Sequence, residues 1–190
     1  MDYTHEIKEY LKRDIEAVMS VDTEQINDAI CAITSAGDRG ATVWVMGNGG
    51  SAATASHFVC DFSNGVYYSP NGNRYNFRCL SDNTPIFTAI ANDHSYDDVF
   101  LRQIKDLLRP DDLVIAISGS GNSENIIKAA EYAKSVGTPV IGVTGYDGGR
   151  LKELSDYKMH VPVNDMQIAE DIHMIFDHMI MKILCNTDKR

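Results

Sequence analysis

The chain has 190 residues, a length that suits one domain and lets it bury about 70% of its unfolded surface. Its 17 basic and 27 acidic residues give a net charge of −10, which disfavours nucleic acid and anionic membranes as partners. The charged N-terminus, the lack of eighteen consecutive apolar residues and the four cysteines without CxxC spacing lead us to expect a protein of the reducing cytoplasm.

Two helices are predicted ahead of the strands. Apolar residues recur at helical spacing over residues 3–18 and again over 22–37. The second segment opens with a capping pattern from Asp22 to Gln25 and closes at Gly37, which marks its two ends.

Five short apolar runs then predict the strands of one sheet: 42–47, 76–80, 112–118, 139–145 and 157–163. Because these runs are rich in Val and Ile and alternate with helical patterns, they indicate a parallel sheet covered by helices on both faces. The stretch 63–76 holds most of the turn-forming residues and is expected to be a loop.

The last predicted helix begins near Asp165 and is apolar on more than one side. One stripe of it contains Ile168, Ile172, Ile175 and Met179. A helix that is apolar nearly all round is buried, either in its own domain or against another subunit. We therefore expect an oligomer.

Two turns rich in glycine and serine follow the first and third predicted strands, at 47–52 and 118–123. Both fall at the carboxyl ends of parallel strands, where ligands bind in open α/β folds. In the second turn, the hydroxyls of Ser118, Ser120 and Ser123 and the free N–H groups of a helix start favour a single phosphate, which needs no basic residue there. Ser123 is placed to cap the helix that begins at Glu124.

Two other interpretations of these turns stay open. They could be tight turns with ordinary helix caps, or Gly47, Gly49 and Ala52 could form a dinucleotide-binding GxGxx[GA] pattern. That pattern needs an acidic residue about 20 positions on, whereas Asp82 comes 35 positions after Gly47. A nucleoside triphosphatase loop would need a lysine, which neither turn contains.

His57 and Asp61 lie one helical turn apart if this stretch is helical, so both side chains reach the same ion. Imidazole and carboxylate together suit zinc, and also nickel or iron. The alternative is a surface hydrogen bond between the two side chains.

Six motifs resemble, in their order and spacing, the sugar isomerase (SIS) domain of phosphoheptose isomerases: "GNGGSA" at 47–52, "HF" at 57–58, "AND" at 91–93, "ISGSGNSENIIKA" at 117–129, "VTGYDGG" at 143–149 and "EDIHMIFDH" at 170–178. The similarity runs from about residue 5 to the end of the chain. It implies an α/β fold of three α/β/α layers with a five-stranded parallel sheet, in which residues 1–190 form a single SIS domain. It also implies a homotetramer with active sites at subunit interfaces, where the helices over 3–37 serve as an oligomerisation arm and the C-terminal helix packs in the oligomer.

The same resemblance implies the residues of the site. A phosphate is held by Ser118, Gly119, Ser120 and Ser123, and the sugar is surrounded by Asn48, Gly49, Gly50, Ser51, Asn92, Asp93 and Glu170. A zinc ion is bound by His57, Asp61, Glu170 and His178. Three positions depart from the family's pattern: Asp61 replaces a glutamate, Glu170 replaces a glutamine and Gly119 replaces a threonine.

The spacing of Glu170 and His178 complicates this zinc site. Eight residues of helix rise about 12 Å, so both reach one ion only if the side chains lean inward, the helix starts irregularly, or a neighbouring subunit supplies a ligand. His173 competes, because it follows Glu170 at a Glu-x-x-His spacing that bundles use for metals; its alternative role is a buried histidine bonded across an interface. Asp177, next to His178, either orients that ring or is solvated.

A ketose-to-aldose conversion moves a proton between neighbouring carbons through an enediol, for which one carboxylate and one acid active near neutral pH suffice. We expect Asp61 as the base, His178 as the acid and Glu170 as a substitute base, with a divalent metal, zinc first, to polarise the carbonyl. The function that the resemblance implies is the conversion of D-sedoheptulose 7-phosphate to a D-glycero-heptose 7-phosphate. The alternatives are a non-catalytic SIS tetramer that binds a replication initiator, an isomerase of another phosphosugar, and a lyase that cleaves a sugar ether.

Overall fold

The computed structural model describes residues 1–69 and 74–186, and its centre is a parallel sheet of five strands in the order β2-β1-β3-β4-β5. The strands are β1 (Thr42–Gly47), β2 (Asn76–Cys79), β3 (Leu113–Ser118), β4 (Val140–Thr144) and β5 (Tyr157–His160). The predicted parallel sheet is confirmed, although β5 is shorter than the predicted run to residue 163. It ends at His160 because this residue pairs with Thr144, the last residue of β4.

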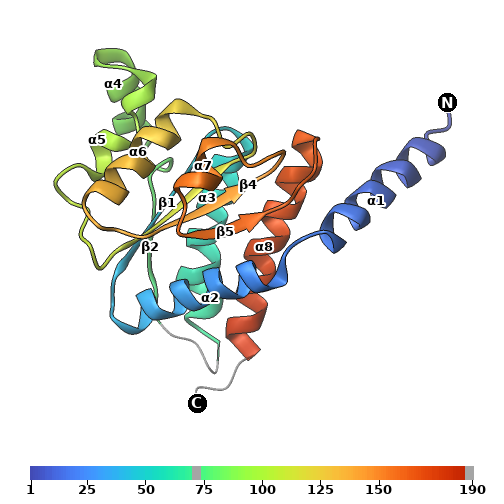
Figure 1. The fold of residues 1–190 in the computed structure, drawn as a ribbon, viewed down its shortest axis with the longest axis horizontal. Helices are drawn as coiled ribbons and strands as arrows, with labels where there is room; N and C mark the ends of the chain where they lie inside the picture. Colours follow the sequence, from blue (N-terminus) through green and yellow to red (C-terminus); the bar gives the residue numbers. More distant parts are fainter. Residues whose placement is uncertain (70–73, 187–190) are drawn as a thin grey trace.

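Helices cover both faces of the sheet and give the expected three layers (Figure 1). The helices that cover it are α2 (Thr23–Asp38), α3 (Gly50–Cys60), α4 (Thr84–Asp93), α5 (Leu101–Ile104), α6 (Glu124–Ser135), α7 (Gly149–Leu154) and α8 (Met166–Asn186). One core, which includes Ile33, Phe58 and Ile172, lies between the sheet and α2, α3 and α8. The other core, which includes Ile104 and Ile127, lies between the sheet and α5, α6 and α7, with α4 beside it.

The two glycine–serine turns lie where the order of the strands reverses. From β1 the chain moves outward to β2, whereas from β3 it moves outward in the other direction to β4 and β5. As a result α3, which follows β1, and α6, which follows β3, pack on opposite faces of the sheet. In such sheets ligands usually bind where the strand order reverses, which here is at the carboxyl ends of β1 and β3.

The two N-terminal helices form as predicted, α1 over Thr4–Met19 and α2 after it. The Asp22 carboxylate caps α2 by accepting from the backbone N–H groups two and three residues later, at 3.0 and 3.1 Å. α2 continues to Asp38, one residue past the predicted end at Gly37. The left-handed turn behind it is made by Gly40, whose φ is +68°.

The predicted loop at 63–76 is wrong at its start. Asp61–Val66 form η1, a π-helical turn that continues directly from α3. Phe62 is buried and stacks on Phe77 with the ring centroids 4.1 Å apart, so apolar packing holds the segment helical despite its Ser-Asn-Gly sequence. The part of the predicted loop at 70–73 lies outside the described residues.

α8 is buried along one face rather than nearly all round. That face consists of Ile168, Ala169, Ile172, His173, Phe176, Asp177 and Ile180. Of the predicted apolar stripe, Ile168 and Ile172 are buried, whereas Ile175 is 38% exposed. The polar members of the buried face, His173 and Asp177, are fully buried.

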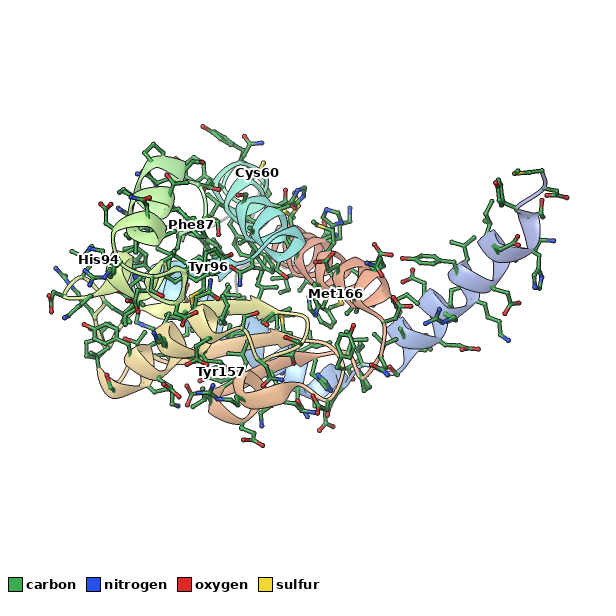
Figure 2. The ribbon with its side chains drawn as sticks, turned by 90° about the horizontal axis from the view of Figure 1, so that it is seen from above. Cys60, Phe87, His94, Tyr96, Tyr157 and Met166 are labelled. Atoms are coloured by element: carbon green, nitrogen blue, oxygen red, sulfur yellow. The ribbon has the colours of Figure 1, made fainter. Side chains whose placement is uncertain are left out.

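α1 extends away from the sheet and touches α8 (Figures 1 and 2). The Arg13 guanidinium donates to Asp165 at 2.7 Å, and the Tyr10 hydroxyl donates to Asp171. Five large apolar side chains recur at every fourth position and are 54–79% exposed; this α1 stripe consists of Tyr3, Ile7, Leu11, Ile15 and Met19.

None of the helices in the described part of the chain combines the length and the apolar character needed to cross a bilayer.

Candidate active site

A pair of asparagines joins the two glycine–serine turns. Asn48 Nδ2 donates to Asn125 Oδ1, and Asn125 Nδ2 donates back to Asn48 Oδ1, each at 2.9 Å. Asn125 is 2% exposed and lies in the first turn of α6, so the pair fixes the start of α6 against the turn after β1. The sequence analysis did not predict Asn125. Its position directly before Ile126 and Ile127 in the first turn of a predicted helix could have indicated a buried amide that needs a hydrogen-bond partner.

The turn after β3 is held in place by the turn after β4. Gly145 N donates to Gly119 O at 2.8 Å, and Leu151 N donates to Gly121 O at 2.9 Å. Gly121 has a φ of +66° and lies so close to a backbone carbonyl of the neighbouring turn that no side chain would fit. The backbone of this turn is therefore fixed by the protein itself.

The serines of this turn contact one another and the backbone. The Oγ atoms of Ser118 and Ser123 are 3.2 Å apart, and Ser120 Oγ accepts from Asn122 N at 3.2 Å. Ser123 occupies the N-cap of α6 as predicted, but its side chain does not cap the helix. The positive end of α6 is therefore left without that cap and favours an anion. A cavity of about 470 Å³ adjoins the turn and is lined by Ser120, Asn122, Tyr146, Asp147 and Asn164.

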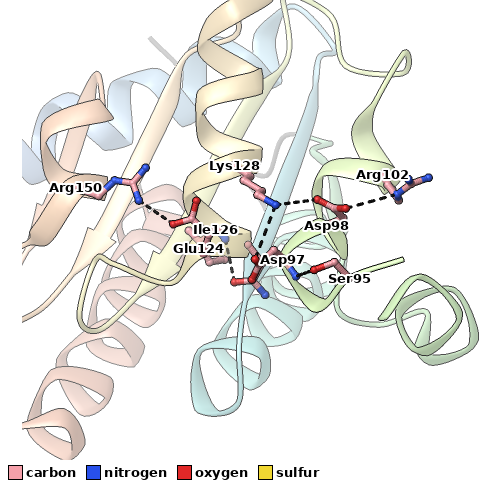
Figure 3. A network of polar contacts seen from close by, with 9 residues as sticks. Ser95, Asp97, Asp98, Arg102, Glu124, Ile126, Lys128 and Arg150 are labelled. Atoms are coloured by element: carbon pink, nitrogen blue, oxygen red, sulfur yellow. Dashed lines mark hydrogen bonds and ion pairs between the residues drawn. The ribbon is translucent and has the colours of Figure 1, made fainter. Parts of the chain in front are cut away.

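A tyrosine from another segment contacts the first turn. Tyr96, in the short helix η2 (Tyr96–Asp98), donates from its hydroxyl to Asn48 Oδ1 at 2.9 Å. η2 is anchored on α6, because Lys128 Nζ lies 3.2 Å from Asp98 Oδ1 and 3.9 Å from Asp97 Oδ2 (Figure 3). The side-chain oxygen of Asn48, expected beside the sugar, thus accepts from two protein donors.

Asn92 and Asp93, also expected around the sugar, lie exposed at the end of α4. Asn92 Nδ2 donates to Asp93 Oδ1 at 2.8 Å. Within the described ranges, neither side chain forms a hydrogen bond to the two turns. The structure therefore does not bring these two residues into the hydrogen-bonded part of the site.

Four side chains of types that can bind a metal meet where α3 passes into η1 beside α8. His57 and Asp61 come from the first segment and Asp177 and His178 from α8, and their ligand atoms all lie within 4.8 Å of one another. His57 Nε2 is 3.1 Å from His178 Nε2 and 3.6 Å from Asp61 Oδ1. These four residues are named the histidine–aspartate cluster below. Two imidazoles and two carboxylates form a ligand set that zinc accepts.

Asp177 is the member of the cluster that was not predicted as a ligand. It is fully buried, and neither carboxylate oxygen has a hydrogen-bond partner among the described residues. The interpretation of Asp177 as a solvated residue is therefore wrong. Burial, and then the negative charge of Asp61, raise the pKa of Asp177 to about 8. The signal in the sequence was the helical spacing of Asp177 from Ala169 and Ile180, two apolar residues on the same face of the last helix.

Glu170, expected as a ligand of the same ion, lies outside the cluster. Its carboxylate packs against Gly50 so closely that a side chain at position 50 would collide with it. This is the first turn of α3, where the helix dipole favours a negative charge. His173 is also outside the cluster, and burial lowers its pKa to about 4, so its ring is neutral near pH 7.

Comparison with known proteins places the chain in a family. A family model described as SIS domain matches residues 2–145. The phosphoheptose isomerase of Aliarcobacter butzleri is 38% identical over 182 residues, which cover 95% of each chain. That of Helicobacter pylori is 35% identical over 183 residues, which cover 96% of this chain and 90% of the relative. The structure of phosphoheptose isomerase from Neisseria gonorrhoeae superposes with a TM-score of 0.88 at 26% identity, covering 98% of this chain and 100% of that one. The chain therefore belongs to the SIS domain family and, within it, to the phosphoheptose isomerases.

Proposed function

We propose that this protein converts D-sedoheptulose 7-phosphate to a D-glycero-heptose 7-phosphate, as a ketose–aldose isomerase that acts through an enediol. One observation carries the proposal: α3 runs to the histidine–aspartate cluster from the turn after β1, which the Asn48–Asn125 pair joins to the turn after β3. Along α3, His57 follows Gly50 by seven residues, a rise of about 10 Å. The glycine turns and the cluster are therefore separate ends of one site, which suits a substrate whose phosphate and carbonyl groups lie at opposite ends of a carbon chain.

The phosphate end of the proposed site is the turn after β3. Its serine hydroxyls and the start of α6 supply donors without a basic side chain, and the fixed backbone limits the rearrangement needed on binding. The residues proposed to hold the phosphate are Ser118, Gly119, Ser120 and Ser123. Those proposed to surround the sugar are Asn48, Gly49, Gly50, Ser51, Asn92, Asp93 and Glu170.

Proton transfer is assigned to the other end of α3. Asp61 removes a proton from C1 of the ketose and returns it to C2, while His178 exchanges a proton between the two oxygens of the enediol. No atom is gained or lost, because substrate and product are isomers. Glu170 lies about two helical turns from His178 on α8 and is kept as the substitute base.

The cofactor is proposed to be a divalent metal ion, with zinc as the first candidate, held by His57, Asp61 and His178. The fit rests on the ligand types and on the ring nitrogens that face each other at 3.1 Å. When bound, the ion would polarise the substrate carbonyl.

The assembly is proposed to be a cytoplasmic homotetramer of single SIS domains spanning residues 1–190, with active sites at subunit interfaces. The α1 stripe supports this proposal, because four large apolar side chains on α1 and Tyr3 at its N-cap are exposed and need a partner surface. Light scattering is expected to give four times the chain mass of 21.1 kDa. A monomer at micromolar concentration would contradict both the tetramer and the shared sites.

The activity is tested by aldose formation from sedoheptulose 7-phosphate with the purified full chain and added zinc. The wild type is expected to form the aldose, and Asp61→Asn is expected to form far less. If the wild type forms no aldose from heptulose, pentulose or hexulose phosphates, the isomerase proposal fails and a non-catalytic SIS protein takes its place.

A further inference from the structure

We infer that Asp177, rather than Glu170, is the fourth protein ligand of the metal, beside His57, Asp61 and His178. The inference deepens the proposed function and rests on its metal site. It concerns a residue of this chain that the family resemblance does not assign to the metal.

The first support is the position of the carboxylate. All four ligand atoms lie within 4.8 Å of one another, close enough to surround one ion. Asp177 is fully buried and neither of its oxygens has a hydrogen-bond partner in the described ranges. A buried carboxylate without a partner is strongly disfavoured unless it is neutralised or paired with a cation.

The second support is the character of the neighbouring groups. Asp61 offers another carboxylate rather than a donor, and the ring nitrogens of His57 and His178 face each other at 3.1 Å. A hydrogen bond between two neutral rings uses one proton and one lone pair. A divalent cation would instead be bound by both rings and balanced by the two carboxylates.

The third support is the alignment of α3 with α8. Glu170 contacts Gly50, and seven residues further along each helix Asp177 lies beside His57. Seven residues of helix rise about 10 Å, so the two carboxylates of α8 stand at different levels of α3. Glu170 lies beside the start of α3 at the glycine turn, whereas Asp177 lies beside His57 near the end of α3.

The test compares two substitutions of the same kind in the full-length protein, Asp177→Asn and Glu170→Gln. Each changes a carboxylate to an amide of nearly equal shape. Zinc affinity is measured by competition with a chelating dye, and bound cobalt is followed by its visible absorption spectrum. Asp177→Asn is expected to weaken zinc binding at least 10- to 100-fold. A loss of roughly this size is typical of residues that only hydrogen-bond to a metal ligand, so the loss of a ligand itself should be no smaller. Glu170→Gln is expected to bind zinc and cobalt as the wild type does.

The inference is overturned if Asp177→Asn binds zinc like the wild type, or if Glu170→Gln loses it. If Asp177→Asn does not fold, a zinc-edge anomalous map of the loaded wild type decides, because it shows directly which carboxylate contacts the ion. A wild type that binds no zinc also overturns the inference. Aldose formation by that same sample then shows separately whether the proposed isomerase activity stands.

Discussion

The two ends of the proposed site are built in opposite ways. The turn after β3 has its backbone bonded to the next turn, and its serine hydroxyls contact protein groups. The histidine–aspartate cluster instead contains a buried carboxylate without a partner in the described part of the chain. The backbone of the first end is fixed by the protein alone, whereas the second end is proposed to be completed by a cation. Substitutions at the two ends should therefore change substrate binding and turnover separately.

The largest expected effect is on turnover at the cluster. Asp61→Asn should lower kcat about 100- to 10,000-fold, because it removes a positioned general base, and should change KM little. Steady-state kinetics with sedoheptulose 7-phosphate measure both constants. Asp61→Glu is the control, since it keeps the carboxylate and restores the residue of the family's pattern.

Glu170→Gln tests whether the general base is Asp61 or Glu170. If Asp61→Asn keeps near-normal turnover while Glu170→Gln is inactive, the base is Glu170 and Asp61 serves only as a ligand.

The next largest effect is expected on KM at the turn after β3. Ser120→Ala and Ser123→Ala should each raise KM about 10- to 100-fold, because a hydroxyl bonded to a charged phosphate contributes about 1.5–3 kcal/mol. Ser135→Ala, at the far end of α6, is the control and should leave KM unchanged. Unchanged KM in both test variants would remove the phosphate from this turn.

A smaller effect is expected on stability where the two turns meet. Asn125→Ala should lower the free energy of unfolding by about 1–3 kcal/mol, because it leaves the amide of Asn48 without its reciprocal partner. For a chain of this length each kcal/mol lowers Tm by about 2–4 °C, which thermal unfolding would detect. Asn125→Asp keeps an acceptor for Asn48 Nδ2 but sets a buried carboxylate oxygen against Asn48 Oδ1, so it should lose at least as much; a clearly smaller loss would show that the bond donated by Asn125 contributes nothing.

The smallest effect is expected at Tyr96. Tyr96→Phe removes one hydrogen bond from a half-exposed side chain and should cost about 1 kcal/mol or less. Tyr68→Phe, on an exposed side chain, is the matched control. A loss several times larger would mean that η2, and not only the Asn48–Asn125 pair, fixes the turn after β1.

The sheet and its helices could be predicted from the sequence because their signals are local. Val- and Ile-rich runs predicted the parallel strands, and Asp22 predicted the start of α2. The π-helical turn Asp61–Val66 could not be predicted in this way. Its Ser-Asn-Gly sequence favours a loop, and only the packing of Phe62 against Phe77 holds it helical.

The site residues that belong to one sequence motif could be predicted from the sequence. The residues that meet only through tertiary contacts could not. The helical spacing of His57 and Asp61 already placed both on one face. The pairing of Asn48 with Asn125 and the approach of Tyr96 depend on how β1, β3 and η2 meet in space. Asp177 was not predicted as a ligand, because the family's motif assigns the metal to the neighbouring residue, His178.

The exposed stripe on α1 has a consequence for dilute solutions. α1 is 16 residues long, close to the length of about 12–15 residues at which an isolated helix is marginal in water, and Ala17 is its buried residue. Its helicity therefore depends on whatever covers the stripe. If the proposed tetramer covers the stripe, we expect dilution to expose it, the helix to fray from its N-terminus, and residues 4–19 to become the segment that a protease cuts first.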